Sequence, residues 1–122
     1  MGPDTLVIEN TSHSPKRRES TRFHEMSHLL CGHSPSAFVE VPGMGVLTRG
    51  YQQDQEDEAD WLGRCLHLPK PVLGFCLNRD WSIEQISQEF LASQELVNYR
   101  LNKSGALMIR RRLARKKSYP TR

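Results

Sequence analysis

The segment 23–33, FHEMSHLLCGH, carries two histidines, His24 and His28, that stand four positions apart. On an α-helix, residues i and i+4 lie one above the other, so both imidazoles face the same point. Glu25 is rotated off that line, but a water molecule held at the same point would lie within its reach. This H-E-x-x-H spacing places two nitrogen ligands and a base on one rigid element. The chain is therefore expected to form a helix here and to build a metal site against it.

A catalytic zinc ion needs a third protein ligand and an open position for water. One known arrangement continues as H-x-x-G-x-x-H, but this chain has Cys31 and Ser34 where the glycine and the last histidine would stand. The other arrangement takes a glutamate from a second helix, and the segment EDEAD supplies Glu56 and Asp60 one helical turn apart. A carboxylate commonly holds the outer N–H of a ligand histidine, which is the role expected of Asp60. Glu58 remains an alternative third ligand.

Local signals predict where the two metal helices begin and end. Ser20 or Thr21 is expected to cap a helix that runs to about Cys31, with Gly32 placed to end it. Residues 54–68 predict the second helix, because acidic residues occupy its first turn and a proline follows its end. The two helices come in the order that the metal site requires.

Other segments predict a small amount of sheet and a close helix contact. Leu6 to Glu9 is a short β-like run, and two further β-like runs flank Pro42-Gly43 as a hairpin or loop. In the second metal helix, Ala59 and Gly63 are small enough to let a neighbouring helix approach closely.

The C-terminal part of the chain reads as helices that close the domain. Ser82 and Gln85 form a capping box, and an apolar stripe follows at Ile83, Ile86 and Phe90. Ser93 is expected to cap a further helix, in which Val97 and Leu101 share one face.

The expected fold class is α+β, a mostly helical, zincin-like minimal domain with a small β-sheet and a helical C-terminal segment. The chain of 122 residues is long enough for one such domain. We expect the domain to span residues 1–109, with a metal core at 20–70 and the helical segment at 82–105. Residues 110–122 are expected to form a basic tail.

With both metal motifs identified, the sequence resembles the ImmA/IrrE-type zinc metallopeptidases. Their pattern is a H-E-x-x-H helix followed by E-x-x-A-[ND] and an apolar stretch ending in proline, which here reads HEMSH and then EDEADWLGRCLHLP. The segments NTSHSPKRRES and SIEQISQEFLASQELVNYRLN are similar to the lead-in and the helical tail of that family. The resemblance covers about residues 6 to 105.

The resemblance implies that His24, His28 and Glu56 bind zinc and that Glu25 is the general base. Zinc would make the bound water acidic and polarise the scissile carbonyl, while Glu25 would pass the water's proton to the leaving amine. We prefer Glu56 to its rival because it stands one turn from Asp60 and matches the first glutamate of the family pattern.

Which group would stabilise the oxyanion besides zinc is left open by the sequence. Tyr51 and His67 are the principal candidates for oxyanion or substrate contacts, with His33 and His13 as further ones. His67 also replaces an apolar residue of the family pattern. Only 23 residues precede the motif, so a partner chain is expected as one way to complete the sheet edge.

The resemblance implies an endopeptidase that cleaves helix-turn-helix transcriptional repressors in stress response or in control of mobile elements. One alternative is a non-catalytic, zinc-binding interaction module that acts like an antitoxin. Another is a DNA-binding protein that uses the helix pair at 82–101, with Gln94, Asn98 and Arg100 available to read base edges.

Charge and cysteine content indicate which partners and which cellular compartment to expect. Nine of the 17 Lys and Arg residues follow Leu96 with no acidic residue among them, so an acidic body precedes a basic end. This end would suit nucleic acid or an acidic partner, although such runs are usually only solvated. Three separated cysteines predict no disulfide framework, which favours a reducing cytoplasm. No apolar run is long enough to predict a membrane span.

Overall fold

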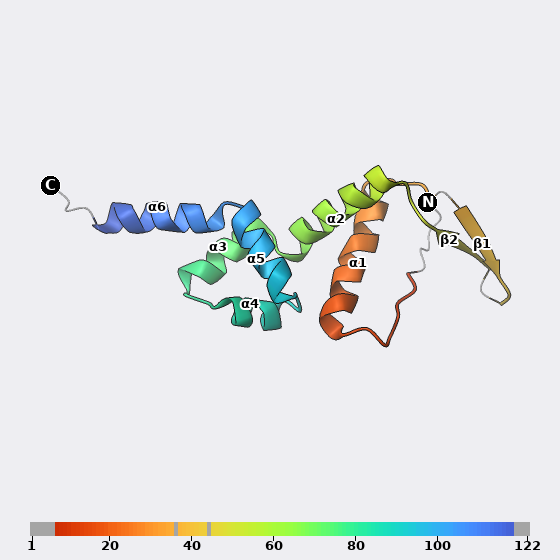
Figure 1. The fold of residues 1–122 in the computed structure, drawn as a ribbon, viewed down its shortest axis with the longest axis horizontal. Helices are drawn as coiled ribbons and strands as arrows, with labels where there is room; N and C mark the ends of the chain where they lie inside the picture. The colour runs from red at the N-terminus through yellow and green to blue at the C-terminus, as the bar shows by residue number, and fades with distance from the viewer. Residues whose placement is uncertain (1–6, 36, 44, 119–122) are drawn as a thin grey trace.

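The computed structural model describes residues 7–35, 37–43 and 45–118, and it is mostly helical (Figure 1). The hairpin and the first two helices gather at one end of an elongated molecule, and the later helices form the other end (Figure 1). In chain order the elements are α1 (Pro15–Leu30), β1 (Ala37–Val41), β2 (Gly45–Arg49), α2 (Gln53–His67), α3 (Lys70–Asn78), α4 (Ile83–Glu89), α5 (Gln94–Lys103) and α6 (Ala106–Ser118).

Helix α1 begins earlier than the sequence predicted. Its cap is Ser14, whose side chain accepts a hydrogen bond from the backbone N–H of Arg17, and Pro15 occupies the first turn. Proline suits this position because its φ is already helical and its missing N–H would have no partner there. The expected start at Ser20 or Thr21 was therefore wrong, since the lead-in segment already belongs to the helix.

The expected β-like run from Leu6 to Glu9 forms no strand over residues 7–9, and Leu6 lies outside the described residues. Glu9 instead pairs with Arg18 and Arg22 on α1. This segment is fixed to the helix by charged side chains rather than by a β-ladder.

Strands β1 and β2 form an antiparallel hairpin, with Val41 opposite Gly45 and Ala37 opposite Arg49. Gly43 has a φ of +80°, a left-handed conformation that glycine adopts without strain. The predicted hairpin at Pro42-Gly43 is confirmed. Within the described ranges the two-stranded hairpin is all the sheet there is, so the helical part of the α+β expectation is confirmed and the sheet is minimal.

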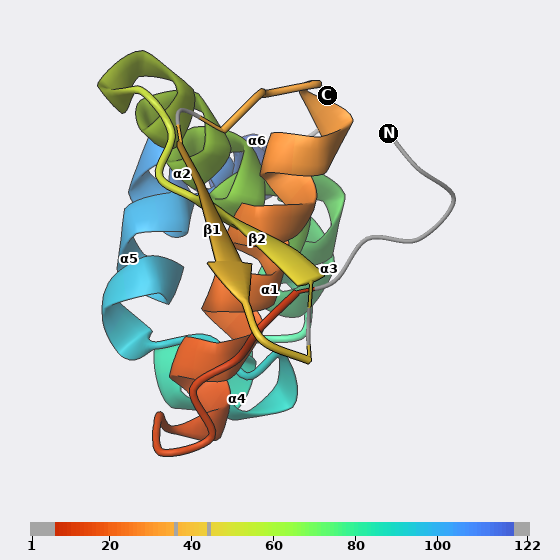
Figure 2. The same ribbon diagram turned by 90° about the vertical axis from the view of Figure 1, so that its right-hand side faces the viewer.

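Helices α1 and α2 lie against each other as the metal motifs require (Figures 1 and 2). Ala59 is fully buried between them. A Cβ atom on Gly63 would stand 3.2 Å from the backbone nitrogen of His24 and 3.3 Å from its Cα, so only glycine fits this crossing without a shift. The predicted close contact at these small residues is confirmed.

The hydrophobic core lies in the C-terminal half. Its buried members come from the end of α2 onward, and they are Leu68, Leu73, Cys76, Leu77, Ile86, Ala92, Val97, Leu101 and Ala106. The predicted capping box between Ser82 and Gln85 is confirmed, and Ser93 caps α5 through the N–H of Leu96. The core thus lies against the C-terminal end of α2, while the metal-motif residues of α2 face those of α1.

Two helices were not predicted individually. Helix α3 follows α2 after only Leu68 and Pro69, and α6 includes most of the segment that was expected to be a basic tail. Helix α6 packs against α3 and α5 before it extends away from the body (Figure 1). None of the described helices has the length and apolar character that crossing a membrane would require.

Candidate metal centre

Three side chains from α1 and α2 converge on one point. His24 Nε2 lies 2.9 Å from Glu56 Oε2, and His28 Nε2 lies 3.0 Å from His24 Nε2 and 3.3 Å from Glu56 Oε1. A tetrahedral zinc ion with bonds of roughly 2.0–2.1 Å would hold its ligand atoms about 3.3 Å apart. The spacings of these four atoms, two imidazole nitrogens and both carboxylate oxygens of Glu56, therefore suit a small divalent cation.

Asp60 lies where it favours the tautomer of His24 that carries its hydrogen on Nδ1. Its Oδ1 lies 2.8 Å from His24 Nδ1, so a hydrogen on Nδ1 can be donated to the carboxylate. With that hydrogen on Nδ1, the neutral ring presents a lone pair on Nε2 towards Glu56 and His28. Lone pairs that meet at this distance repel one another unless a hydrogen or a cation lies between them. The donor set thus fits a metal ion on chemical grounds as well as by distance.

His28 is the buried ligand candidate, with 1% of its side chain exposed. Burial, followed by the nearby His24, lowers the pKa of His28, which favours the neutral ring that can ligate; the charge of Glu56 opposes this shift. The Tyr51 ring stacks on it, with centroids 3.6 Å apart and planes 8° from parallel. Tyr51 therefore lies at the candidate site, as the sequence analysis considered.

Glu25 is half-buried beside these ligands. Burial is the largest cause that raises the pKa of its carboxyl group; the charge of Glu56 adds to the effect and His24 opposes it. Burial also raises the pKa of the Tyr51 phenol, with Glu25 and Glu56 as further causes. A carboxylate of increased basicity and a phenol that keeps its hydrogen are thus held at one site.

The two glutamates that competed for the third ligand position point to different clusters. Glu56 joins His24 and His28, whereas Glu58 lies with Cys31 and His33. His33 Nδ1 is 2.9 Å from His28 Nδ1, on the side of the ring away from Glu56. The sequence analysis considered His33 only as an oxyanion candidate. The spacing of Cys31 and His33 on either side of Gly32 was the sequence signal that could have indicated the cluster with Glu58.

A family model matches most of the chain. Residues 4–102 match the model of the IrrE N-terminal-like domain, Peptidase_M78. The chain belongs to this family. Membership implies a metal-dependent peptidase, and the His24, His28 and Glu56 cluster is a possible metal site for it. Searches of curated proteins and of solved structures gave no match.

His67 serves the packing of this IrrE-like domain. Its ring stacks on Phe23 of α1 at a centroid distance of 4.6 Å, and its Nε2 donates to the Phe90 carbonyl 2.8 Å away. The side chain is buried between the metal helices and the α4–α5 corner. This double contact explains why a histidine stands where the family pattern has an apolar residue. His13 lies away from the metal cluster and contacts Asn10.

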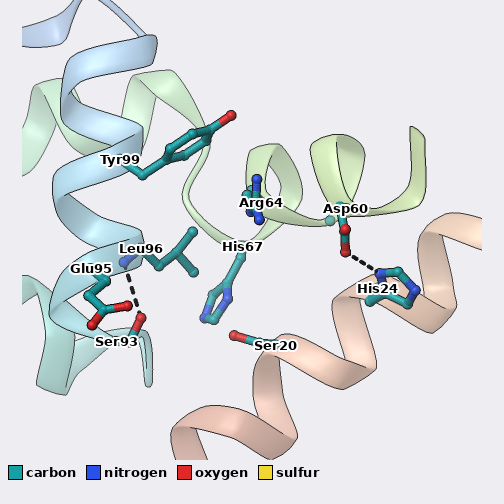
Figure 3. Close-up of a pocket in the computed structure, with 10 residues that line it drawn as sticks. Ser20, His24, Asp60, Arg64, His67, Ser93, Glu95, Leu96 and Tyr99 are labelled. Atoms are coloured by element: carbon teal, nitrogen blue, oxygen red, sulfur yellow. Dashed lines mark hydrogen bonds and ion pairs between the residues drawn. The ribbon is translucent and has the colours of Figure 1, made fainter. Parts of the chain in front are cut away.

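A cavity of about 420 Å³ lies beside the metal cluster, between α1, α2 and the start of α5 (Figure 3). Of the metal-site residues, His24 and Asp60 line it, while His67 and Tyr99 contribute further along its wall. Figure 3 shows Asp60 reaching across to His24 at one end. The cavity therefore adjoins the orienting carboxylate rather than the point where Glu25 and the ligand atoms meet.

The helix pair at 82–101 packs as a closing element of the IrrE-like domain. Arg100, which the sequence analysis considered for base reading, is buried and donates from Nε to the Leu68 carbonyl at 2.9 Å. Gln94 and Asn98 are exposed. Because its arginine is committed to the core, this pair lacks one of the side chains on which the DNA-reading alternative depended.

Proposed function

We propose that this domain is a zinc-dependent endopeptidase in which His24, His28 and Glu56 hold the metal. The observation that carries the proposal is the convergence of the two Nε2 atoms of His24 and His28 with the Glu56 carboxylate, at separations of 2.9, 3.0 and 3.3 Å, with Glu25 half-buried beside them. Two imidazoles and one carboxylate leave one position open for water, which is the ligand set of a catalytic rather than a structural zinc.

Each side chain has a role that follows from its surroundings. When bound, zinc supplies a Lewis acid that polarises the substrate carbonyl and acidifies water. Glu25 accepts the proton of the attacking water and returns it to the leaving amine, and its raised pKa suits both steps. Asp60 holds His24 in the ligating tautomer. Tyr51, protonated and stacked on His28, is the group we propose for oxyanion stabilisation.

The substrate class that we propose is a helix-turn-helix transcriptional repressor, in stress response or in control of mobile elements. Support for this class comes from the sequence resemblance alone. A partner chain that completes the sheet edge is part of the same proposal, since β1 and β2 form a two-stranded hairpin.

The experiment compares zinc-loaded wild-type protein with Glu25→Gln on a peptide library prepared from a whole proteome. We expect new peptide termini, identified by mass spectrometry, from the wild type and none from the variant. Glu25 is not one of the converging ligands, so the variant should keep its bound zinc. A purified helix-turn-helix repressor, added as an intact substrate, then tests the proposed class.

A matched control is Glu19→Gln, which removes one carboxylate from α1 outside the metal cluster. It should leave cleavage unchanged. Equal sets of termini from the wild type and Glu25→Gln would overturn the peptidase proposal. A zinc-loaded protein that binds a repressor without cutting it would support the interaction module instead.

A further inference from the structure

We propose a second cation site in which the Cys31 thiolate, the His33 imidazole and the Glu58 carboxylate bind Zn²⁺ or another thiophilic divalent ion. We call this cluster the thiol site. It lies where the end of α1 meets the beginning of α2 and shares no ligand with the His24, His28 and Glu56 cluster.

The three side chains already lie together. Each offers one ligand atom, and these atoms all lie within 4.8 Å of one another. His33 Nε2 is 3.5 Å from Glu58 Oε1, and the Cys31 thiol donates a hydrogen bond to Glu58. Small rotations of side chains therefore suffice to bring a sulfur, a nitrogen and an oxygen to bonding distance from one ion.

The backbone that holds two of these ligands is fixed by the helix cap. Gly32, with φ +69°, donates its N–H to the Leu29 carbonyl at 3.1 Å, and His33 donates its N–H to the His28 carbonyl at 3.0 Å. This pair of hydrogen bonds is the Schellman motif that commonly ends helices. Cys31 and His33 flank its glycine, so the motif sets the positions of both ligands before any ion binds.

The donor set and its exposure suit a borderline-soft ion. Thiolate and imidazole select zinc-like metals, and a carboxylate completes three protein ligands with a fourth position for water. The His33 side chain is 7% exposed and that of Glu58 is 57% exposed, so the buried imidazole is reached past an open carboxylate. Binding releases the Cys31 proton to solvent, because the thiolate is the ligand form.

Cobalt titration of the full chain tests the thiol site directly. A bond between Co²⁺ and a thiolate gives a charge-transfer band in the near ultraviolet, and the nitrogen and oxygen ligands of the other cluster give none. We expect the band in the wild type and in Cys65→Ser, which changes another partly buried cysteine. It should disappear in Cys31→Ser. Bound zinc should fall from about two ions per chain to about one in the same variant.

Two further variants separate this proposal from the proposed function. His24→Ala removes a ligand of the first cluster, so a band that persists in it shows that the thiol site binds Co²⁺ without the metal of the first cluster. Glu58→Gln replaces an exposed carboxylate ligand with a neutral amide and should weaken the cobalt affinity, with an unchanged far-ultraviolet circular dichroism spectrum. No band in the wild type at saturating Co²⁺, or a band that survives Cys31→Ser, would overturn the thiol site.

Discussion

His28 and His33 face each other through their Nδ1 atoms, which lie 2.9 Å apart. A neutral histidine that ligates through Nε2 carries its hydrogen on Nδ1. If both rings ligated in this way, two hydrogens would meet in a contact that has room for one. Metal binding at one of the two proposed sites is therefore expected to weaken metal binding at the other.

The prediction is that emptying the first cluster strengthens the thiol site. His24→Ala leaves the contact between His28 and His33 in place and frees His28 to accept the His33 hydrogen. Recovery of one hydrogen bond should raise the Co²⁺ affinity of the thiol site about tenfold. Titration of the thiolate band in both proteins measures this change, and equal affinities would contradict the coupling.

Asp60 is predicted to act on metal affinity through His24. Asp60→Ala removes the carboxylate 2.8 Å from His24 Nδ1, so the ring loses its preferred tautomer and orientation. Losses of this kind typically reduce metal affinity about 10–100-fold. Because Asp60 is partly exposed, we expect the loss of zinc affinity in Asp60→Ala to lie near the lower end of this range. Competition with a zinc chelator is the measurement. Asp57→Ala, which removes an acceptor for Gln53 in the same helix, is the control and should not change the affinity.

Gly63 is predicted to set the distance between the metal helices. In Gly63→Ala the new Cβ would meet the His24 backbone at 3.2–3.3 Å, so α1 must shift. Overpacking of this kind costs about 1–3 kcal/mol, against a helix-propensity gain of about 1 kcal/mol. We expect a small net loss in the free energy of unfolding and weaker zinc binding.

Gly74→Ala is the matched control for that variant. Gly74 also lies within a helix, but a Cβ there meets nothing within 4 Å. It should raise the free energy of unfolding by about 0.5–1 kcal/mol and leave zinc binding unchanged. A gain in stability at both glycines, with full metal affinity, would show that α1 adjusts freely.

Local signals explain which parts of this fold were predictable. The capping box at Ser82, the turn at Gly43 and the helix of residues 54–68 each follow from a few neighbouring residues. Glu56 and Glu58 differ by two positions on a helix, which turns their side chains about 200° apart. Pairing Glu56 with Asp60 on one face was therefore enough to favour it, and the structure directs the two glutamates to separate clusters.

The parts that were missed depend on tertiary contacts. The early start of α1 was hidden because the basic run after Pro15 reads as a loop, although Glu9 neutralises part of it. The double contact of His67 with Phe23 and Phe90 joins segments 44 and 23 residues away, and no local pattern encodes it. The thiol site was also missed, because Cys31 and Glu58 become neighbours only where α1 and α2 cross.

Glu9 is predicted to make the free energy of unfolding depend on pH in the acidic range. Hydrogen bonds from Arg22 and then Arg18 lower the pKa of its carboxyl group to about 2. A carboxyl group whose pKa is lowered by folding stabilises the protein above its unfolded pKa, and that contribution is lost as pH falls through the folded value. Wild type should therefore be more stable than Glu9→Gln near pH 6, and the difference should shrink between about pH 5 and about pH 2.

Urea unfolding midpoints of both proteins across this range measure the effect. Glu40→Gln, on an exposed residue of β1, controls for the loss of one carboxylate elsewhere. The difference between wild type and Glu9→Gln isolates the contacts to α1, because all other carboxylates titrate in both proteins. If that difference stayed constant with pH, the pairs with Arg18 and Arg22 would not form in solution. The segment before α1 would then be fixed by something other than charge.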